Sequence, residues 1–526
     1  MSTEFENALQ NIRFTATIED AKNAYHKMSE AYKSTVDEDV FVRFFTGRDR
    51  STILWHDYEA GGVHAKSAPP MQFAAVRTDL DLNVIDCPID VYARLDCDKL
   101  PHPEAVAITH INPMKCMKEG LPEPEFFRRI NQEMSYPDTC TTGYNSMNYD
   151  EEATRFGLWR SLIPVYNREF ENNNSRWDLL PVMAAYASLK IPGVVIPTNE
   201  EGQTTLKLEA LAPANNIKQD NAHNAVDDVF ALIGLAKVLK RASPLLWDYL
   251  YEGRRKKAAS GRCLMGTTGM LFSPMMGAKN NYGKPVLIIG NNPQNTNSGK
   301  VYVELDDMEN VRSLWRMSPE QIKENLFKKG EMLESEGIKR PPLSTLKVNE
   351  SPAFIPFSWL VRHGFVKDDS PVIAGDKIGN QRDFLEKLIS VFADADYPEE
   401  TNPELKLYGG FPSRNDKQQL SRMSYMPLFE AFGSVKAEFE DPDLNQLYLN
   451  ARARLRGYDG VQLSDEELYA WRFHCSSLHA MPVDEASKGN NLNLSNVDEV
   501  LAKTEMDDAL RAGYKEYLNY VRRELG

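Results

Sequence analysis

Two carboxylates end an apolar run near the start of the chain. The stretch ILWHDYEAGG (53–62) places Asp57 and Glu59 on either side of one tyrosine and just before two glycines. In a strand, alternate side chains share a face, so both acids would point the same way, one pleat apart. Two anions this close repel each other unless a proton or a cation lies between them. The pair is a solvated strand end or half of a divalent-metal site, and this fragment alone favours the solvated strand end.

Three more residues that could bind a metal ion or take part in catalysis follow later in the chain. Asp150 in GYNSMNYDEEATR (143–155) stands between a predicted strand and a predicted helix, and NAHNAVDDVFALIG (221–234) places His223 and Asp228 where another helix begins. Taken singly, such a histidine is most often a structural hydrogen bonder, and such an aspartate is most often a helix cap or dipole partner. Their order along the chain is therefore more informative than any one of them.

The strands and helices that must position these residues are predicted from the sequence pattern, and together they indicate an α/β domain over about 51–243. Short apolar or alternating runs predict strands, and runs with apolar residues three or four apart predict helices. Strands are predicted at 51–57, 72–79, 91–96 and from 139, and helices at 123–134, 151–163, 177–189 and 223–242. Strands first and helices with crossing connections later are typical of a mixed sheet flanked by helices.

The remaining sequence predicts two further domains and a short lead-in. Short strands at 262–272, 284–290 and 300–306 surround the turn-rich GNNPQNTNSG, which predicts a small β-containing domain with added helices at about 244–400. From 401 to 526 the pattern is helical, and 496–525 carries apolar residues at three- and four-residue steps. Residues 1–50 form an acidic, partly helical extension to which no role is assigned.

Composition narrows the class of protein. A chain of 526 residues is too long for one core, and it holds no apolar run of membrane-spanning length. Six scattered cysteines without a CxxC pair argue against a zinc ribbon or a disulfide framework. The first fifty residues match neither a signal nor a transit peptide, so we expect a cytoplasmic protein. The net charge of −15 does not exclude DNA, because a binding cleft needs only local positive potential.

The order Asp-x-Glu, Asp, then His-x4-Asp resembles that of the DEDDh 3′→5′ exonucleases. The resemblance extends to bacterial exonuclease I, a single-strand-specific DNA exonuclease family, from about residue 51 to at least 456. It is carried by HDYEAGG, PMQFAAVRTD, GYNSMNYDEEATR, NSRWDLLPVM, NAHNAVDDVFA, LYGGF and NARAR. The resemblance implies a ribonuclease H-like nuclease domain with a mixed sheet, an SH3-like β-containing domain and a C-terminal helical domain. It also implies a role in DNA repair and recombination.

The chemistry implied by the resemblance suits these residues. Two Mg²⁺ ions roughly 3.5–4 Å apart stabilise both the attacking and the leaving oxygen of a phosphodiester, and Mn²⁺ is the expected substitute. Because Mg²⁺ prefers hard oxygen ligands, a few carboxylates and the substrate phosphate suffice. By resemblance, Asp57 bridges both ions, Glu59, Asp150 and Asp228 complete the site, and His223 is the general base.

The VDD segment leaves a choice between two acids. Helix geometry favours Asp227, because residues i and i+4 from His223 share a face, whereas the family spacing selects Asp228. We follow the family spacing, since His223 is expected to precede the helix. Glu151 and Glu152, directly after Asp150, are interpreted as first-turn dipole partners.

Contacts to DNA are implied at several further positions. Arg155 matches a DNA-contacting arginine of the family and can grip a phosphate with two hydrogen bonds. Tyr166 and Phe170 fall where the family stacks aromatic rings on unpaired bases, although core packing explains them equally well. Lys207 replaces a usual arginine, and Ala60 replaces the threonine of the family's DYET motif, which removes a hydroxyl near the 3′ end.

A basic cluster near the first domain boundary predicts a phosphate-tracking groove, whereas such runs are more often solvated helix faces. Its members are Lys237, Lys240, Arg241, Arg254, Arg255, Lys256, Lys257 and Arg262. By resemblance, the partners are single-stranded DNA and the acidic tail of single-stranded DNA-binding protein, docked near Arg262, Lys190 and Tyr249, and the protein is a monomer. Two alternatives stay open: a DEDDh exoribonuclease, and a non-catalytic protein that binds or recruits to single-stranded DNA.

Overall fold

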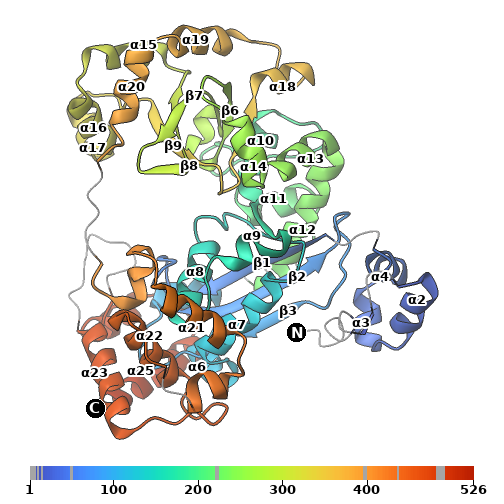
Figure 1. Cartoon of the computed structure of the whole chain (residues 1–526), viewed down its shortest axis with the longest axis vertical. Coiled ribbons are helices and arrows are strands. Elements are labelled where there is room, and N and C mark those ends of the chain that lie inside the picture. The colour runs from blue at the N-terminus through green and yellow to red at the C-terminus, as the bar shows by residue number, and fades with distance from the viewer. Residues whose placement is uncertain are drawn as a thin grey trace. The chain divides into compact units, whose positions relative to one another are not determined.

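The computed structural model describes residues 8, 11–12, 16–47, 51–218, 224–394, 400–434, 437–480 and 492–526 (Figure 1). The chain forms two compact units. The first comprises residues 1–175, 219–233 and 399–526, and the second comprises residues 176–218 and 234–398. Within the described ranges, no helix combines the length and the apolar character that a membrane crossing requires.

The first unit is built on a mixed sheet. Its strands are β1 (Thr52–Ala60), β2 (Pro70–Thr78), β3 (Ile89–Tyr92) and β4 (Thr139–Gly143), in the order β3-β2-β1-β4. β1 pairs with β2 antiparallel and with β4 parallel, so it is a central strand, and β2 is buried along its whole length. β5 (Ser175–Asp178) begins where the chain passes into the second unit.

The strand predicted at 91–96 is wrong in its second half. β3 ends at Tyr92, after which only an isolated bridge joins Ala93 to Leu121. The physical reason is that the Arg94 amide donates to the Leu121 carbonyl, outside the sheet, and the carbonyls of Asp96 and Lys99 face the Tyr517 hydroxyl of α25 (Asp508–Leu525) instead of a neighbouring strand.

Helices cover the sheet of the first unit. They are α5 (Pro103–Thr109), α6 (Pro113–Glu119), α7 (Glu123–Met134), α8 (Asp150–Arg160), α9 (Asn167–Phe170) and the 3-10 turn η1 (Glu171–Asn173). α7 and α8 pack closely, because Gly157 leaves room for the Phe127 ring. These two helices and strands β1 and β2 bury one continuous apolar core.

The C-terminal helices belong to the same unit and share that core. They are η5 (Pro403–Tyr408), α21 (Arg414–Ser424), η6 (Glu430–Ser434), α22 (Pro442–Arg454), α23 (Asp465–His479), α24 (Val497–Lys503) and α25 (Asp508–Leu525). α22 packs on α7 and α8, and α25 packs on α6. The three- and four-residue spacing of apolar residues in α25 buries Leu510, Tyr514, Tyr517, Leu518 and Val521.

Part of the N-terminal extension folds into a group of three helices, α2 (Ile18–His26), α3 (Glu30–Thr35) and α4 (Glu38–Phe45), seen in dark blue in Figure 1. Their aromatic core is joined to the β2–β3 connection. The Tyr32 hydroxyl donates to the Ile85 carbonyl at 2.7 Å, and Arg43 donates to the buried Asp79 carboxylate at 2.8 Å.

The second unit contains a five-stranded antiparallel sheet in the order β10-β6-β7-β8-β9. The strands are β6 (Thr268–Phe272), β7 (Gly283–Asn292), β8 (Asn295–Glu304), β9 (Leu343–Lys347) and β10 (Ala353–Pro356). Alternate residues of β7 enter different cores, Leu287 and Ile289 on one face and Val286 and Ile288 on the other.

The second unit also contains helices. They are α10 (Leu179–Ser188), α11 (Leu208–Ala214), the C-terminal part of α12 (Ala225–Ala242), α13 (Pro244–Gly253), α14 (Lys256–Arg262), α15 (Met308–Ser313), α16 (Pro319–Phe327), α17 (Gly330–Ser335), α18 (Phe357–Arg362), α19 (Ser370–Gly379) and α20 (Arg382–Ser390). Of these, α10, α14, α18, α19 and α20 pack on the sheet. The short 3-10 turns are η2 (Pro274–Met276), η3 (Ala278–Asn280) and η4 (Leu314–Arg316). The strand predicted from Arg262 is wrong in its first half, because Arg262 ends α14 and Gly266, at a φ of 85°, turns the chain before β6.

The predicted fold class is confirmed. The mixed nuclease-type sheet, the antiparallel β-containing domain and the C-terminal helices are the parts that the sequence predicts.

Candidate active site

The carboxyl-terminal half of β1 carries Asp57 and Glu59, the two acids predicted to share one face of the strand. Asp57 lies opposite Ala74 of β2, and Glu59 lies opposite Gln72. β1 loses its partner β4 after Trp55, and its register with β2 shifts between Glu59 and Ala60. The acids therefore stand where β1 pairs with β2 and no longer with β4, just before the regular ladder ends, and both side chains are half-buried.

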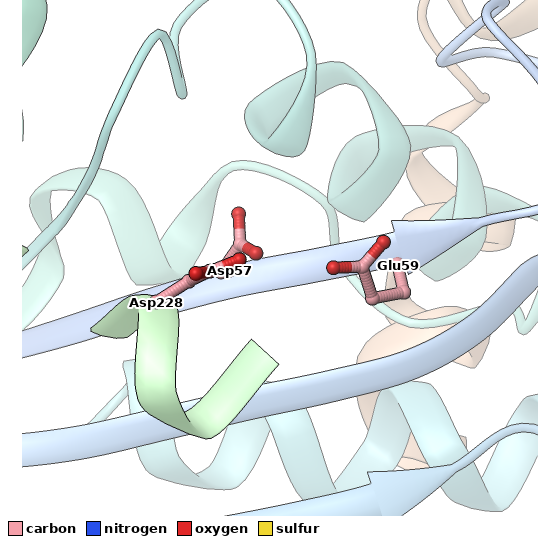
Figure 2. Close-up of side chains that lie close together, drawn as sticks. All are labelled: Asp57, Glu59 and Asp228. Carbon is pink, nitrogen blue, oxygen red and sulfur yellow. The ribbon is translucent and has the colours of Figure 1, made fainter. Parts of the chain in front are cut away.

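Helix α12 brings a third carboxylate to this strand. Asp228 stands in its first turn, and one carboxylate oxygen each of Asp57, Glu59 and Asp228 lie within 4.8 Å of one another. Figure 2 shows the three groups together, two from β1 and one from α12. The neighbouring Asp227 is not in this group, so the structure gathers the acid that the family spacing selects.

The proximity of these acids changes their protonation. Burial, and next the charge of Asp228, raise the pKa of Asp57 to about 7. Burial, and next the charges of Asp57 and Asp228, raise the pKa of Glu59 to about 8. Without a cation, the folded protein at neutral pH thus disfavours the fully ionised cluster.

The donor set fits a hard divalent cation. All three groups offer carboxylate oxygens, which Mg²⁺, Ca²⁺ and Mn²⁺ prefer, and none offers sulfur or imidazole. A bound cation would offset the repulsion that, after burial, contributes to the two raised pKa values. The arrangement can therefore hold a metal ion where a strand end meets a helix N-terminus.

Asp150 lies outside that group of three. It is the first residue of α8 and is buried. Burial, and next the charges of Asp150 and Glu59, raise the pKa of the phenol of Tyr149, which directly precedes Asp150. Its hydroxyl donates to the Gly62 carbonyl at 2.5 Å. His223, the predicted general base, lies outside the described residues, and α12 begins at Ala225.

Arg155 is held by protein carboxylates. Its guanidinium donates to both oxygens of Glu169, at 2.8 and 3.1 Å, and to Glu152 at 2.9 Å. It lies over the ring of Tyr166, which packs against the core. Phe170 differs, because 64% of its surface is exposed.

The two acids after Asp150 do more than face the dipole of α8. Glu151 forms a buried ion pair with Arg168, with N and O 2.9 Å apart. Glu152 binds Arg155 and accepts a hydrogen bond of 2.5 Å from the hydroxyl of Tyr408. Sequence reasoning missed Tyr408 as a neighbour of α8, although the quoted LYGGF segment contains it.

The other predicted contact residues belong to the second unit. Lys207 is exposed and pairs with Glu209 at 3.3 Å. The Arg262 guanidinium lies 3.6 Å from the centre of the Tyr249 ring and donates to Glu252 at 3.0 Å. The Tyr249 ring lies 4.1 Å from that of Trp359, which makes a cation–aromatic stack. Within the basic cluster, Lys237, Arg241, Lys256 and Lys257 are exposed.

Three protein families match most of the chain. A family described as Exonuclease matches residues 54–236, the Exonuclease I SH3-like domain matches 254–367, and the Exonuclease I C-terminal domain matches 401–523. The N-terminal helices precede all three matched ranges.

Individual relatives agree with these matches. Exodeoxyribonuclease I of Haemophilus influenzae is 34% identical over 410 residues, which cover 76% of this chain and 85% of that protein. The structure of E. coli exonuclease I in complex with a dA16 oligonucleotide has a TM-score of 0.79 and 29% identity over 90% of this chain and all of that chain. A structure of SSB/exonuclease I in complex with the inhibitor CFAM has a TM-score of 0.74 and 28% identity over 90% of this chain and 99% of that chain. The chain, with its nuclease domain and its acidic cluster on β1 and α12, belongs to the exodeoxyribonuclease I family.

Proposed function

We propose that this enzyme is a Mg²⁺-dependent exonuclease that removes nucleotides from the 3′ end of single-stranded DNA and releases nucleoside 5′-monophosphates. The observation that carries the proposal is the group of three carboxylates on β1 and α12, in a chain of this family. We further infer the division into an extension at 1–50, a nuclease domain at 51–243, an SH3-like domain at 244–400 and a helical domain at 401–526.

The carboxylates hold the cations in this proposal. Asp57, Glu59 and Asp228 supply oxygen ligands, and Asp150, at the start of α8, supplies a fourth carboxylate. When bound, two Mg²⁺ ions activate water and neutralise charge on the attacking and leaving oxygens. His223 takes the proton of the attacking water, for which an unperturbed imidazole pKa near 6.5 is suitable.

Aromatic and basic side chains bind the strand. The exposed ring of Phe170 offers a stacking surface for an unpaired base, a contact that contributes about 1–3 kcal/mol per base. A phosphate would compete with Glu152 and Glu169 for the guanidinium of Arg155. The ring of Tyr166 lies against the guanidinium of Arg155, with the guanidinium carbon 5.6 Å from the ring centre. The exposed lysines and arginine of the basic cluster suit the backbone of a polyanion.

The stack of Arg262 on Tyr249 suits an acidic peptide tail. A relative's structure is described as an SSB/exonuclease I complex, which supports the acidic tail of single-stranded DNA-binding protein as the partner. Arg262→Ala should weaken binding of a fluorescent tail peptide, measured by anisotropy. Unchanged peptide affinity would remove Arg262 from the docking surface.

The decisive experiment follows the DNA itself. The purified protein is incubated with Mg²⁺ and a 5′-labelled single-stranded DNA oligonucleotide, with duplex DNA and RNA as separate substrates. We expect stepwise shortening from the 3′ end of single-stranded DNA, its loss in Asp228→Ala and its retention in the matched control Asp227→Ala.

Other outcomes would decide for the alternatives. Equal or faster loss of RNA would identify an exoribonuclease. Tight binding of single-stranded DNA without cleavage in any divalent cation would identify a binding protein and refute the enzymatic proposal.

A further inference from the structure

The segment of residues 96–101, between β3 and α5, is held by tyrosines of helix α25. The Tyr517 hydroxyl lies 2.8 Å from the Asp96 carbonyl oxygen and 2.5 Å from that of Lys99. The Tyr514 hydroxyl donates to the Pro101 carbonyl. Both rings are fully buried, so each hydroxyl depends on these carbonyls inside the protein.

Ion pairs from the end of α22 hold the same segment. Arg456 donates to both carboxylate oxygens of Asp96, at 2.6 and 2.9 Å. Arg454 donates to Asp98 at 2.7 and 3.1 Å and is itself buried. Buried charges need such partners, so the 96–101 segment is tied to the C-terminal helices at successive residues.

The other end of the segment touches the strand that carries the acids. A Cβ atom added to Gly61 would lie 2.6 Å from the Cβ of Pro101, so the two residues are in close contact. The amide of His102 donates to the Gly61 carbonyl at 2.7 Å, and the Gly61 amide donates to the Pro69 carbonyl at 2.8 Å. Gly61 stands two residues after Glu59.

Beyond Trp55 the described sheet supports the strand end from one side, through β2, and that pairing becomes irregular after Glu59. The β1–β4 pairing ends at Trp55, and the β1–β2 register shifts between Glu59 and Ala60. Ala60 lies opposite Pro70, which has no amide hydrogen to donate. The backbone beyond Glu59 is therefore placed by its contacts with Pro101 and His102 as well as by the ladder.

We propose that Tyr514 and Tyr517 are positioning residues of the metal centre. Through the 96–101 segment and Gly61, they hold Glu59 at the spacing from Asp57 and Asp228 that binds a cation. The C-terminal helical domain then has a second role besides any contact with DNA, namely to complete a site in which it supplies no ligand. The inference rests on the metal-dependent function proposed above.

Metal binding without DNA tests this inference. Mn²⁺ is titrated calorimetrically into the full-length protein, into Tyr514→Phe/Tyr517→Phe and into Tyr448→Phe. Tyr448→Phe is the matched control, since its hydroxyl donates to the Ala431 carbonyl within the C-terminal helices, at 3.3 Å. Changes in residues that orient metal ligands lower affinity roughly 10–100-fold, and for a contact one step further removed we expect about three- to tenfold. The control should bind Mn²⁺ like the unaltered protein.

A second variant acts at the other end of the same contact. Pro101→Gly removes the Cβ and the ring that face Gly61 and leaves both tyrosines, so it should weaken Mn²⁺ binding even if the double tyrosine variant does not fold. Unaltered Mn²⁺ affinity in Pro101→Gly, or in a folded double variant, would overturn the positioning role. An equal loss in Tyr448→Phe would overturn it too, because the effect would then be general. Absence of Mn²⁺ binding in the unaltered protein would refute the metal centre and the proposed function with it.

Discussion

Replacing Asp228 by asparagine should make the metal-free protein more stable while it removes the exonuclease activity. Asp228→Asn keeps the size of the side chain and deletes one of three charges that lie within 4.8 Å of one another. Stability and activity should therefore move in opposite directions, as expected where a site holds like charges together.

The magnitude follows from the raised pKa values. Burial first and Asp228 second raise the pKa of Asp57 from 3.8 to about 7. Because one pKa unit corresponds to about 1.4 kcal/mol, ionising Asp57 in the folded, metal-free protein costs about 4 kcal/mol. Asp228 is the smaller of the two causes, so its share is under half. We expect Asp228→Asn to raise the free energy of unfolding by about 1–2 kcal/mol at pH 8.5 in EDTA.

The sign of the pH dependence is fixed by the direction of the shifts. Asp57 and Glu59 have folded pKa values above their unfolded ones, so the folded state binds more protons and loses stability as the pH rises from about 4 to about 8. At pH 5 both groups are protonated and the repulsion is absent. The gain from Asp228→Asn should therefore appear at pH 8.5 and vanish at pH 5.

Thermal unfolding in EDTA at the two pH values measures this effect, and Asp227→Asn is the control on the same helical turn. A gain of 1 kcal/mol in the free energy of unfolding raises the melting temperature of a domain of roughly 150–250 residues, such as the nuclease domain, by about 2–4 °C. Mg²⁺ should stabilise the unaltered protein more than Asp228→Asn. A lower melting temperature for Asp228→Asn at pH 8.5, or an equal gain in Asp227→Asn, would refute the reasoning.

Two further predictions concern the packing that supports the site. Burial raises the pKa of Glu404, but the charges of Arg454 and Lys99 lower it by more, so that the net pKa is about 2. The ionised carboxylate therefore stabilises the fold above pH 4.5, and this stabilisation is lost as the pH falls toward 2. Glu404→Gln should lower the free energy of unfolding at pH 7 by about 3 kcal/mol and flatten its decline in acid. Urea unfolding between pH 2.5 and 7 checks this, and an equally steep decline in the variant would contradict it. Gly157→Ala would place a Cβ 2.0 Å from the Phe127 ring, so overpacking between α7 and α8 should destabilise by about 1–3 kcal/mol in thermal unfolding. Gly157→Ala/Phe127→Leu should recover part of the loss, and no recovery would place the strain elsewhere.

Local sequence determined the elements and the acids of the site. The apolar run before Asp57 forms a strand whose alternation turns Asp57 and Glu59 to one face. The periodic pattern at 496–525 forms two helices, α24 and α25, which bury their apolar residues. Both follow from backbone periodicity, which depends only on neighbouring residues.

Which acid joins the pair was decided by the position of α12. Asp227 and Asp228 are adjacent and chemically identical, and helix geometry measured from His223 favours the former. The helix begins at Ala225 and brings Asp228 to β1, and this placement depends on packing that no local pattern encodes.

The contacts that hold the site were decided by tertiary structure alone. Arg454 meets Asp98, and Tyr517 meets the Asp96 and Lys99 carbonyls, across more than 350 residues of chain. From sequence, Arg454 belongs to a motif and Asp98 is one acid among many, and neither predicts the other. A buried charge is tolerated only where folding supplies its partner, so such pairs are specified by the fold as a whole and not by the spacing of the residues that form them.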